Sequence, residues 1–248
     1  MRINVLGPIE ITDGTRVVRP AGQAQRALLA ALVLDHGKVV PAGRLATVLW
    51  GDRQPPTART KIQSHVSALR QAMGSSPHDA MGPLLTIPPG YLLSEASATD
   101  LTEFTTLVAK GTLAAESGEQ APASALLGRA LELWRGPAFA GVSAPLVTAA
   151  AEALNEQRLL AAEAKAEADL ALGRCGTVVA DMSVWLIRHP LRERLRGLLM
   201  MALHNLGCRA DALTVYQAGQ EKMKDELGIE PGAWLRAVYH RVLLDNAA

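Results

Sequence analysis

Between Pro55 and Gly74 the apolar residues recur with the spacing of one face of an α-helix. They stand at i, i+4, i+7 and i+11, and they are Ile62, Val66, Leu69 and Met73. Pro55 and Pro56 end the preceding segment, and Thr57 occupies the position of a helix N-cap. The pattern therefore predicts an amphipathic helix that buries one stripe in a core.

The other side of this predicted helix carries cations, amides and hydroxyls. Its polar residues are Arg59, Lys61, Gln63, Ser64, His65, Ser67, Arg70 and Gln71, and no carboxylate occurs between Asp52 and Asp79. Such a face suits DNA phosphates and base edges. An ordinary solvated helix face is the alternative, so the flanking sequence has to decide between the two.

Short alternating segments at 2–6, 9–11 and 16–18 predict three strands, because turn signals stand at Gly7-Pro8 and Asp13-Gly14. Two apolar-periodic helices follow, from Gln23 to near Gly37 and from Gly43 to Trp50, with an extended Val39-Val40 between them. After the helix at Pro55–Gly74 come a polar loop at Ser75–Gly82 and two strands, Leu84–Ile87 and Tyr91–Leu93, joined by Pro88-Pro89-Gly90.

This order of three strands, three helices and a hairpin predicts a winged helix with an additional N-terminal sheet. The second and third helices form the helix-turn-helix, the third is the recognition helix, and the hairpin is the wing. Tyr91 fits better as a core ring of the wing than as a DNA contact.

From Leu101 onward the sequence predicts helices almost without interruption. The expected spans are 101–117, 121–134, 144–173, 177–188, 192–206, 209–226 and 232–245. Leu172-Gly173 recurs as Leu206-Gly207, a step of 34 residues, which is the tetratricopeptide period. We therefore expect stacked helix pairs that form a short superhelix with a protein-binding surface.

The distribution of charge supports a polyanion partner for the front of the chain. The 248 residues carry a net charge of +1. Residues 1–97 hold 10 Lys and Arg against 6 Asp and Glu, whereas residues 98–248 hold 15 against 18. The start of the chain lacks a signal-peptide pattern, and no apolar run is long enough to span a membrane. With only two cysteines and no disulfide framework, we expect a reduced, cytoplasmic protein without a membrane partner.

Several motifs resemble one known family in the correct order. VLGPIEI, QRALLAALVLDHGKVV, LATVLWGD, VSALRQAM and IPPGYLL look like the N-terminal DNA-binding domain of the Streptomyces antibiotic regulatory protein (SARP) family. RALELWRGPAFAGV, HPLRERLRGLLMMALHNLG and the stretch from Arg209 to Leu243 resemble the bacterial transcriptional activator domain (BTAD). The expected fold is mainly α with a small β part: a response-regulator-type winged helix-turn-helix at 1–96, then an all-α tetratricopeptide-like domain at 97–248. This is the small, two-domain form of the family.

The resemblance implies which residues of the third helix enter the major groove. The DNA-binding candidates are Arg59, Thr60, Lys61, Ser64, His65, Ser67, Ala68, Arg70 and Gln71. Lys61 and Arg70, expected to point outward, would hold phosphates or guanine edges, and Arg59 a phosphate at the start of the helix. Ser64 and Ser67 would bond a base or phosphate, and Ala68 would touch a thymine methyl. His65 has an equal alternative role as a wedge against the second helix.

The resemblance also implies a transcriptional activator of a secondary-metabolite gene cluster. Its partners would be double-stranded promoter DNA with direct repeats near the −35 region, and RNA polymerase with its sigma factor, touched by the turn of Gly51, Asp52, Arg53 and Gln54. Family members often carry several arginines in the third helix and one at the end of the wing, and the positions near Ala68 and Ser94 lack them. Binding as a homodimer or in tandem is therefore expected. The alternative is a protein-interaction adaptor whose winged helix no longer binds DNA.

No constellation of residues suggests an enzyme, a cofactor or a metal site. The turn at Gly173 lacks the spacing of a phosphate-binding loop, and Ser64-His65 has no orienting acid nearby. Cys175 and Cys208 are expected to be buried small residues at helix starts. The run of Arg192, Arg194 and Arg196 is expected to form intramolecular salt bridges, and a second polyanion site is the alternative.

Overall fold

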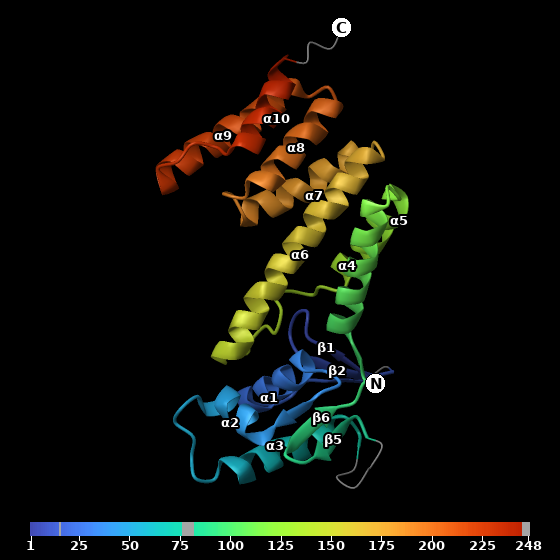
Figure 1. Ribbon diagram of the computed structural model, residues 1–248, viewed down its shortest axis with the longest axis vertical. Coiled ribbons are helices and arrows are strands. Elements are labelled where there is room, and N and C mark those ends of the chain that lie inside the picture. The colour runs from blue at the N-terminus through green and yellow to red at the C-terminus, as the bar shows by residue number, and fades with distance from the viewer. Residues whose placement is uncertain (15, 76–81, 245–248) are drawn as a thin grey trace. The chain divides into compact units, whose positions relative to one another are not determined.

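The computed structural model describes residues 1–14, 16–75 and 82–244 (Figure 1). The chain forms two compact units, and each is described by itself. The first unit comprises Met1–Leu107 and Ala130–Arg158, and the second comprises Val108–Arg129 and Leu159–Ala248. The polar loop expected at Ser75–Gly82 lies almost wholly outside the described residues.

A four-stranded sheet opens the first unit. Its spatial order is β3 (Arg16–Val18), β2 (Glu10–Asp13), β1 (Arg2–Asn4) and β7 (Ala98–Thr99). The antiparallel pairing of β1, β2 and β3 confirms the three strands predicted for the N-terminal sheet, with Ile3 opposite Ile11. The parallel pairing of β7 with β1 was not predicted, because two residues are too few to show an alternating pattern.

The remaining elements of the first unit form the winged helix. They are α1 (Gln23–Leu34), β4 (Val39–Pro41), α2 (Ala42–Trp50), α3 (Ala58–Ala72), β5 (Leu84–Ile87) and β6 (Gly90–Leu93). The three helices pack against one another. β6 pairs with both β5 and β4, so the predicted hairpin supplies two strands of a three-stranded sheet in which β6 is the central strand. The winged helix-turn-helix expected from the sequence is confirmed.

The core between these elements is made by the stripes that the periodicity singled out. Leu28, Leu29 and Leu32 of α1 are fully buried, as are Leu45 of α2 and Ile62 of α3, and the two other helices pack against α1. Burial of each such side chain stabilises the fold by about 1.5–3 kcal/mol relative to exposure. The apolar side of α3 is therefore packed against α1 and α2, and its polar side faces the solvent.

Asp100 ties the first strand to the beginning of α4 (Asp100–Glu116). Its buried carboxylate accepts the N–H of Val5 at 2.7 and 2.9 Å and the N–H of Leu6 at 3.0 Å. Arg135 lies 3.6 Å from the same carboxylate and donates its backbone N–H to the carbonyl of Leu6. Burial raises the pKa of Asp100 above its ordinary value, while the two N–H groups and the arginines Arg135 and Arg2 oppose that shift.

These bonds make the compact first unit larger than the expected DNA-binding domain. Residues 98–107 and 130–158 belong to it because they satisfy the backbone polar groups at the end of β1. The domain boundary expected between residues 96 and 97 stays a prediction. The two compact units are divided at other positions, after Leu107, Arg129 and Arg158. Three helices contribute to both units, namely α4, α5 (Gln120–Glu132) and α6 (Pro145–Ala171).

The second unit is all helical within the described residues. It adds α7 (Cys175–Arg188), α8 (Glu193–Asn205), α9 (Arg209–Leu227) and α10 (Ala233–Leu244) to its parts of α4, α5 and α6. Each expected helix ends within two residues of the observed one. Buried clusters join α6, α7 and α8, and then α8, α9 and α10.

Equivalent glycine turns confirm the predicted repeat. Gly173 and Gly207 have φ of 73° and 79°, and the residue after each donates its N–H to the carbonyl five residues earlier. Gly118, with φ of 79° and the same backbone bonds, makes a third turn of this kind. Glycine is favoured there because the left-handed conformation costs it nothing. The successive helix pairs are thus α4–α5, α6–α7 and α8–α9.

The arginine run at the start of α8 is used inside the protein, and Arg192 and Arg194 make the predicted salt bridges. Arg192 binds Glu163 at 2.8 Å, and Arg194 binds Glu167. Arg196 is buried and donates to the carbonyls of Val215 and Pro190 at 2.7 and 2.8 Å. These contacts occupy the cationic groups that a second polyanion site would need.

The prediction that both cysteines are buried is right for Cys175 and wrong for Cys208, which is exposed. Cys175 is the first residue of α7 and packs in the cluster with α8, whereas Cys208 precedes α9 as its N-cap residue. Among the helices of the described ranges, none is both long and apolar enough to cross a bilayer.

We expect Gly90→Ala to destabilise the first unit, because a Cβ at this position would lie 1.9 Å from the carbonyl oxygen of Val40 and 2.7 Å from Cα of Pro41. Backbone atoms cannot rotate away as a side chain can, so the paired strands must separate. The cost should be about 2–3 kcal/mol, read as a lower midpoint of thermal unfolding. Gly43→Ala is the control, since nothing lies within 4 Å of its added Cβ, and α2 should gain up to about 1 kcal/mol. Equal midpoints for the two variants would contradict the close approach.

Asp100→Ala should lower the free energy of unfolding by about 2–4 kcal/mol, because it leaves two buried N–H groups without an acceptor. Glu103→Ala, three residues on, removes only a half-exposed ion pair with Arg2 and should cost less than about 1 kcal/mol. Chemical denaturation of the two variants in parallel tests the difference. A cost for Asp100→Ala no larger than that for Glu103→Ala would show that water replaces the lost carboxylate.

Candidate DNA-binding surface

α3 begins at Ala58, two residues after the second of two successive prolines, and ends at Ala72, with Met73 as its C-cap residue. The N–H of Ala58 donates to Pro55, and that of Lys61 to Thr57, at 2.9 and 3.0 Å. Thr57 is the N-cap residue as predicted, although its side chain makes no capping bond. Ile62, Val66, Leu69 and Met73 are buried, which confirms the predicted apolar stripe.

Directly opposite this stripe lies a row of uncharged polar residues. Thr60, Ser64, Ser67 and Gln71 have the spacing of the buried residues but are shifted by two positions, which is about 200° around the helix. All four are exposed. They present hydroxyls and an amide, groups that both donate and accept hydrogen bonds. We call these four residues the central row.

Cations flank the central row on both sides. One position earlier along the helix are Arg59, Gln63 and Arg70, and one position later are Lys61, His65 and Ala68. A shift of one position is about 100° around the helix. Arg59, Gln63 and Lys61 are exposed, while Arg70, His65 and Ala68 are half-buried. The surface thus has a neutral centre with positive charge at its edges.

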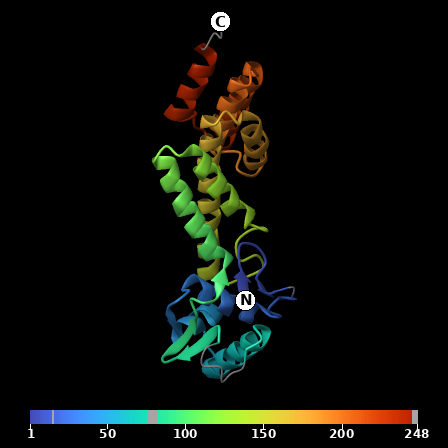
Figure 2. The same cartoon turned by 90° about the vertical axis from the view of Figure 1, so that its right-hand side faces the viewer.

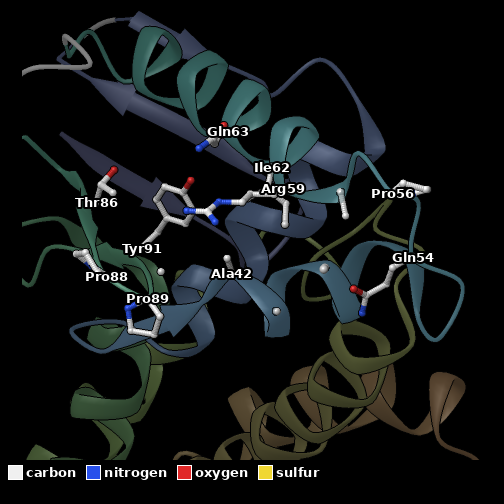
Figure 3. A pocket seen from close by; sticks show the side chains of 14 residues that line it. Ala42, Gln54, Pro56, Arg59, Ile62, Gln63, Thr86, Pro88, Pro89 and Tyr91 are labelled. Carbon is white, nitrogen blue, oxygen red and sulfur yellow. The ribbon is translucent and has the colours of Figure 1, made fainter.

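The Arg59 side of α3 faces a groove of about 530 Å³ that the helix forms with α2 and the hairpin (Figure 3). Figure 3 shows the Arg59 side chain extending from the first turn of α3 across this space. The groove is lined by Ala42, Gly43, Ala46, Gln54, Pro56, Ala58, Arg59, Ile62, Gln63, Thr86, Pro88, Pro89, Gly90 and Tyr91. None of these residues is acidic, so the groove suits an anion or a polar neutral chain. Tyr91 is 7% exposed, which confirms its predicted place in the core of the wing.

Arg70 does not point outward as expected. Its Nε donates to the carbonyl of Leu84 at 2.9 Å, and its Nη2 donates to Oγ1 of Thr86 at 2.8 Å. Both acceptors belong to β5, which lies beside α3 in both views (Figure 1 and Figure 2). The helix period shows only that Arg70 is off the apolar stripe, and it carries no information about the strand beyond the loop.

The turn between α2 and α3 exposes all four of its candidate contact residues. Gly51, Asp52, Arg53 and Gln54 are all exposed, and Gly51 has φ of 60°. Gln54 folds back, since its Nε2 donates to Oγ1 of Thr47 at 3.3 Å, and it also lines the groove. Asp52 and Arg53 are therefore the turn residues best placed to meet another protein.

Gln63 and Thr86 belong to this surface but were not among the predicted site residues. The spacing could have found Gln63, because it lies four residues after Arg59 on the same side of α3. No signal in the sequence could have found Thr86, which reaches the surface only through the pairing of β5 with β6. Within the described ranges, no group of three or more His, Cys, Asp or Glu residues could hold a metal ion.

Sequence profiles assign both halves of the chain. The profile described as "Bacterial transcriptional activator domain" matches residues 99–243, and the one described as "Transcriptional regulatory protein, C terminal" matches residues 20–92. The second profile covers the helix-turn-helix and the hairpin that form the surface described above.

Three proteins illustrate the relatives of this chain. Regulatory protein DnrI of Streptomyces peucetius is 36% identical over 250 residues, covering 98% of this chain and 92% of DnrI. Regulatory protein AfsR of Streptomyces griseus is 35% identical over 244 residues, which are 98% of this chain but 24% of AfsR. The structure of Mycobacterium tuberculosis EmbR in complex with a low-affinity phosphopeptide matches with a TM-score of 0.89 and 37% identity, covering 98% of this chain and 64% of that one.

These matches agree with the motifs, the winged helix and the paired helices of the second unit. The activator-domain profile covers more than half of the chain, and DnrI is matched along almost its whole length. The chain therefore belongs to the Streptomyces antibiotic regulatory protein family of transcriptional regulators.

Proposed function

We propose that this protein is a transcriptional activator that binds double-stranded promoter DNA through α3 and the β5–β6 hairpin. The observation that carries the proposal is the arrangement of α3, with an uncharged central row between two cationic edges. A helix in the major groove points its central row at base edges, while its two sides face the two phosphate backbones. The exposed surface of α3 has the chemistry required at each of these places.

The candidates divide into two roles under this proposal. Lys61 and Arg59 hold phosphates on opposite sides of the helix, and the hydroxyls and amide of the central row contact bases. Gln71 suits adenine, whose N6 and N7 match a side-chain amide, and Ala68 suits a thymine methyl. Sequence reading then depends on few contacts, so a single copy would hold its site weakly. This supports binding of two copies to direct repeats near the −35 region, as a homodimer or in tandem.

The turn between α2 and α3 is our candidate contact for RNA polymerase and its sigma factor. Asp52 and Arg53 are exposed and lie in the turn that precedes the two prolines and the start of α3. Membership of the family supports control of a secondary-metabolite cluster, such as one for an antibiotic. Because promoter DNA and polymerase occupy the bacterial cytoplasm, the protein would act there, and no step of this function needs catalysis or a cofactor.

A protein-interaction adaptor that does not bind DNA is the competing function. The helix pairs of the second unit favour it, because stacked pairs of this kind commonly present peptide-binding surfaces. The acid-free groove and the cations of α3 favour DNA instead. A salt titration separates the two functions.

The logarithm of the DNA association constant should fall linearly with the logarithm of salt concentration, with a slope of about 0.9 per phosphate contacted. Lys61→Ala should reduce that slope by about 0.9 and weaken binding at low salt, because one phosphate contact is lost. Lys110→Ala, which removes an exposed lysine of α4, serves as the control and should leave the slope unchanged. Fluorescence anisotropy with duplex DNA selected by the protein from a random library supplies the measurement. Failure to select any DNA, even at low salt, would favour the adaptor.

Asp52→Ala and Arg53→Ala should retain DNA affinity while lowering activated transcription several-fold, because both residues lie in the turn before α3 and not on the stripes of α3 that would contact DNA. Reconstituted transcription from a promoter carrying the selected site gives the activity, and anisotropy gives the affinity. Glu119→Ala, at an exposed turn of the second unit, is the matched control. If full activation persists in both turn variants, polymerase is contacted elsewhere.

A further inference from the structure

The hairpin carries no positive charge of its own. After Arg70, the next Lys or Arg in the sequence is Lys110, so neither strand of the hairpin nor its connecting residues supply a cation. A wing that approaches the DNA backbone commonly relies on Lys or Arg for affinity. Here the guanidinium bonded to the hairpin comes from α3.

Two bonds fix that guanidinium to one strand. Nε of Arg70 meets the carbonyl of Leu84, a fully buried residue, and Nη2 meets the hydroxyl of Thr86 two residues further along the strand. The planar fork of an arginine holds two acceptors in a set direction. Thr86 stands opposite Tyr91 in the hairpin and lines the groove, so the bond reaches the wall of the groove that faces Arg59.

The last turn of α3 is also held at its backbone. The carbonyl of Arg70 accepts both the N–H and the hydroxyl of Ser75, at 3.0 and 3.2 Å. The base of the Arg70 side chain is thereby fixed, and its tip is fixed on β5. Arg70 therefore connects α3 to β5 through a side chain that is restrained at both ends.

We propose that Arg70 is a positioning residue, which locks the hairpin at a fixed distance from α3 so that both elements meet the DNA together. This inference rests on the proposed DNA-binding function, and it replaces the direct phosphate or guanine contact expected for Arg70. Without the bonds from Arg70 to β5, α3 can still bind DNA, but the hairpin is no longer held where it contacts the DNA. Affinity falls because the contact of the hairpin with DNA is lost, and since the hairpin has no cation, this loss does not change the number of counterions that binding releases.

The test compares Arg70→Ala, Thr86→Val and Thr86→Ser. Thr86→Val removes the acceptor hydroxyl at almost constant shape, whereas Thr86→Ser keeps it. On the selected duplex, Arg70→Ala should weaken binding about tenfold, as expected for loss of a hydrogen bond to a charged group, with the salt slope unchanged. Thr86→Val should weaken binding in the same direction, Thr86→Ser should bind like the wild type, and Arg70→Ala with Thr86→Val should be no weaker than Arg70→Ala alone.

Amide hydrogen exchange of the free protein provides a readout without DNA. Arg70→Ala and Thr86→Val should speed exchange in the hairpin and leave α1 unchanged, whereas Lys61→Ala should alter neither. Hydroxyl-radical footprints should lose the protection given by the hairpin and retain that given by α3.

Three results would overturn the proposal. A salt slope reduced by about 0.9 in Arg70→Ala with unchanged hairpin exchange would make Arg70 a phosphate contact. Additive losses in the double variant would make Arg70 and Thr86 independent of each other. If Arg70→Ala binds DNA with the affinity of the wild type, Arg70 has no role in DNA binding. A wild-type protein that selects no DNA overturns the proposed function and this inference together, and the other three results leave the proposed function standing.

Discussion

The double pairing of β6 is the constraint on which the winged helix depends. β6 is bonded on one side to β5 and on the other to β4, and β4 runs directly into α2. The pairing of Gly90 with Pro41 brings backbones so close that no side chain fits between them. The start of α2 and the tip of the hairpin are therefore held together, and the groove in front of α3 takes its two walls from this junction.

Much of this architecture could be predicted, because its signals are local. The spacing of Ile62, Val66 and Leu69 determines which side of α3 is buried, and the glycine turns at Gly173 and Gly207 mark the helix pairs. The features that were missed join distant segments. They are the pairing of β7 with β1, the hydrogen bonds from Val5 and Leu6 to Asp100, and the hydrogen bond from Arg70 to Thr86. None of these leaves a periodic pattern in the sequence, because each depends on a partner that only the folded chain brings close.

The same division holds for the candidate site. The sequence identified the polar side of α3 and placed Tyr91 in the core, but it treated the cations as equivalent. The structure distinguishes them: Lys61 and Arg59 are exposed on opposite sides, whereas Arg70 is bonded to the hairpin. Similarly, Gln54 is turned back toward α2 while Asp52 and Arg53 remain at the surface. The helix period shows on which side of α3 a residue lies. Contacts with other elements decide whether its charged group is free to bind DNA.

The attachment of β1 to Asp100 and Arg135 has a consequence for how such regulators can be recombined. The profile of the regulatory domain ends at residue 92 and that of the activator domain starts at residue 99, so the two look like separable modules. Yet the residues from Ala98 onward supply both the strand beside β1 and the carboxylate of Asp100 that accepts from Val5 and Leu6. Chimaeras that exchange the DNA-reading part between relatives should carry residues through 158 along with it, or the transplanted sheet will lack its partners.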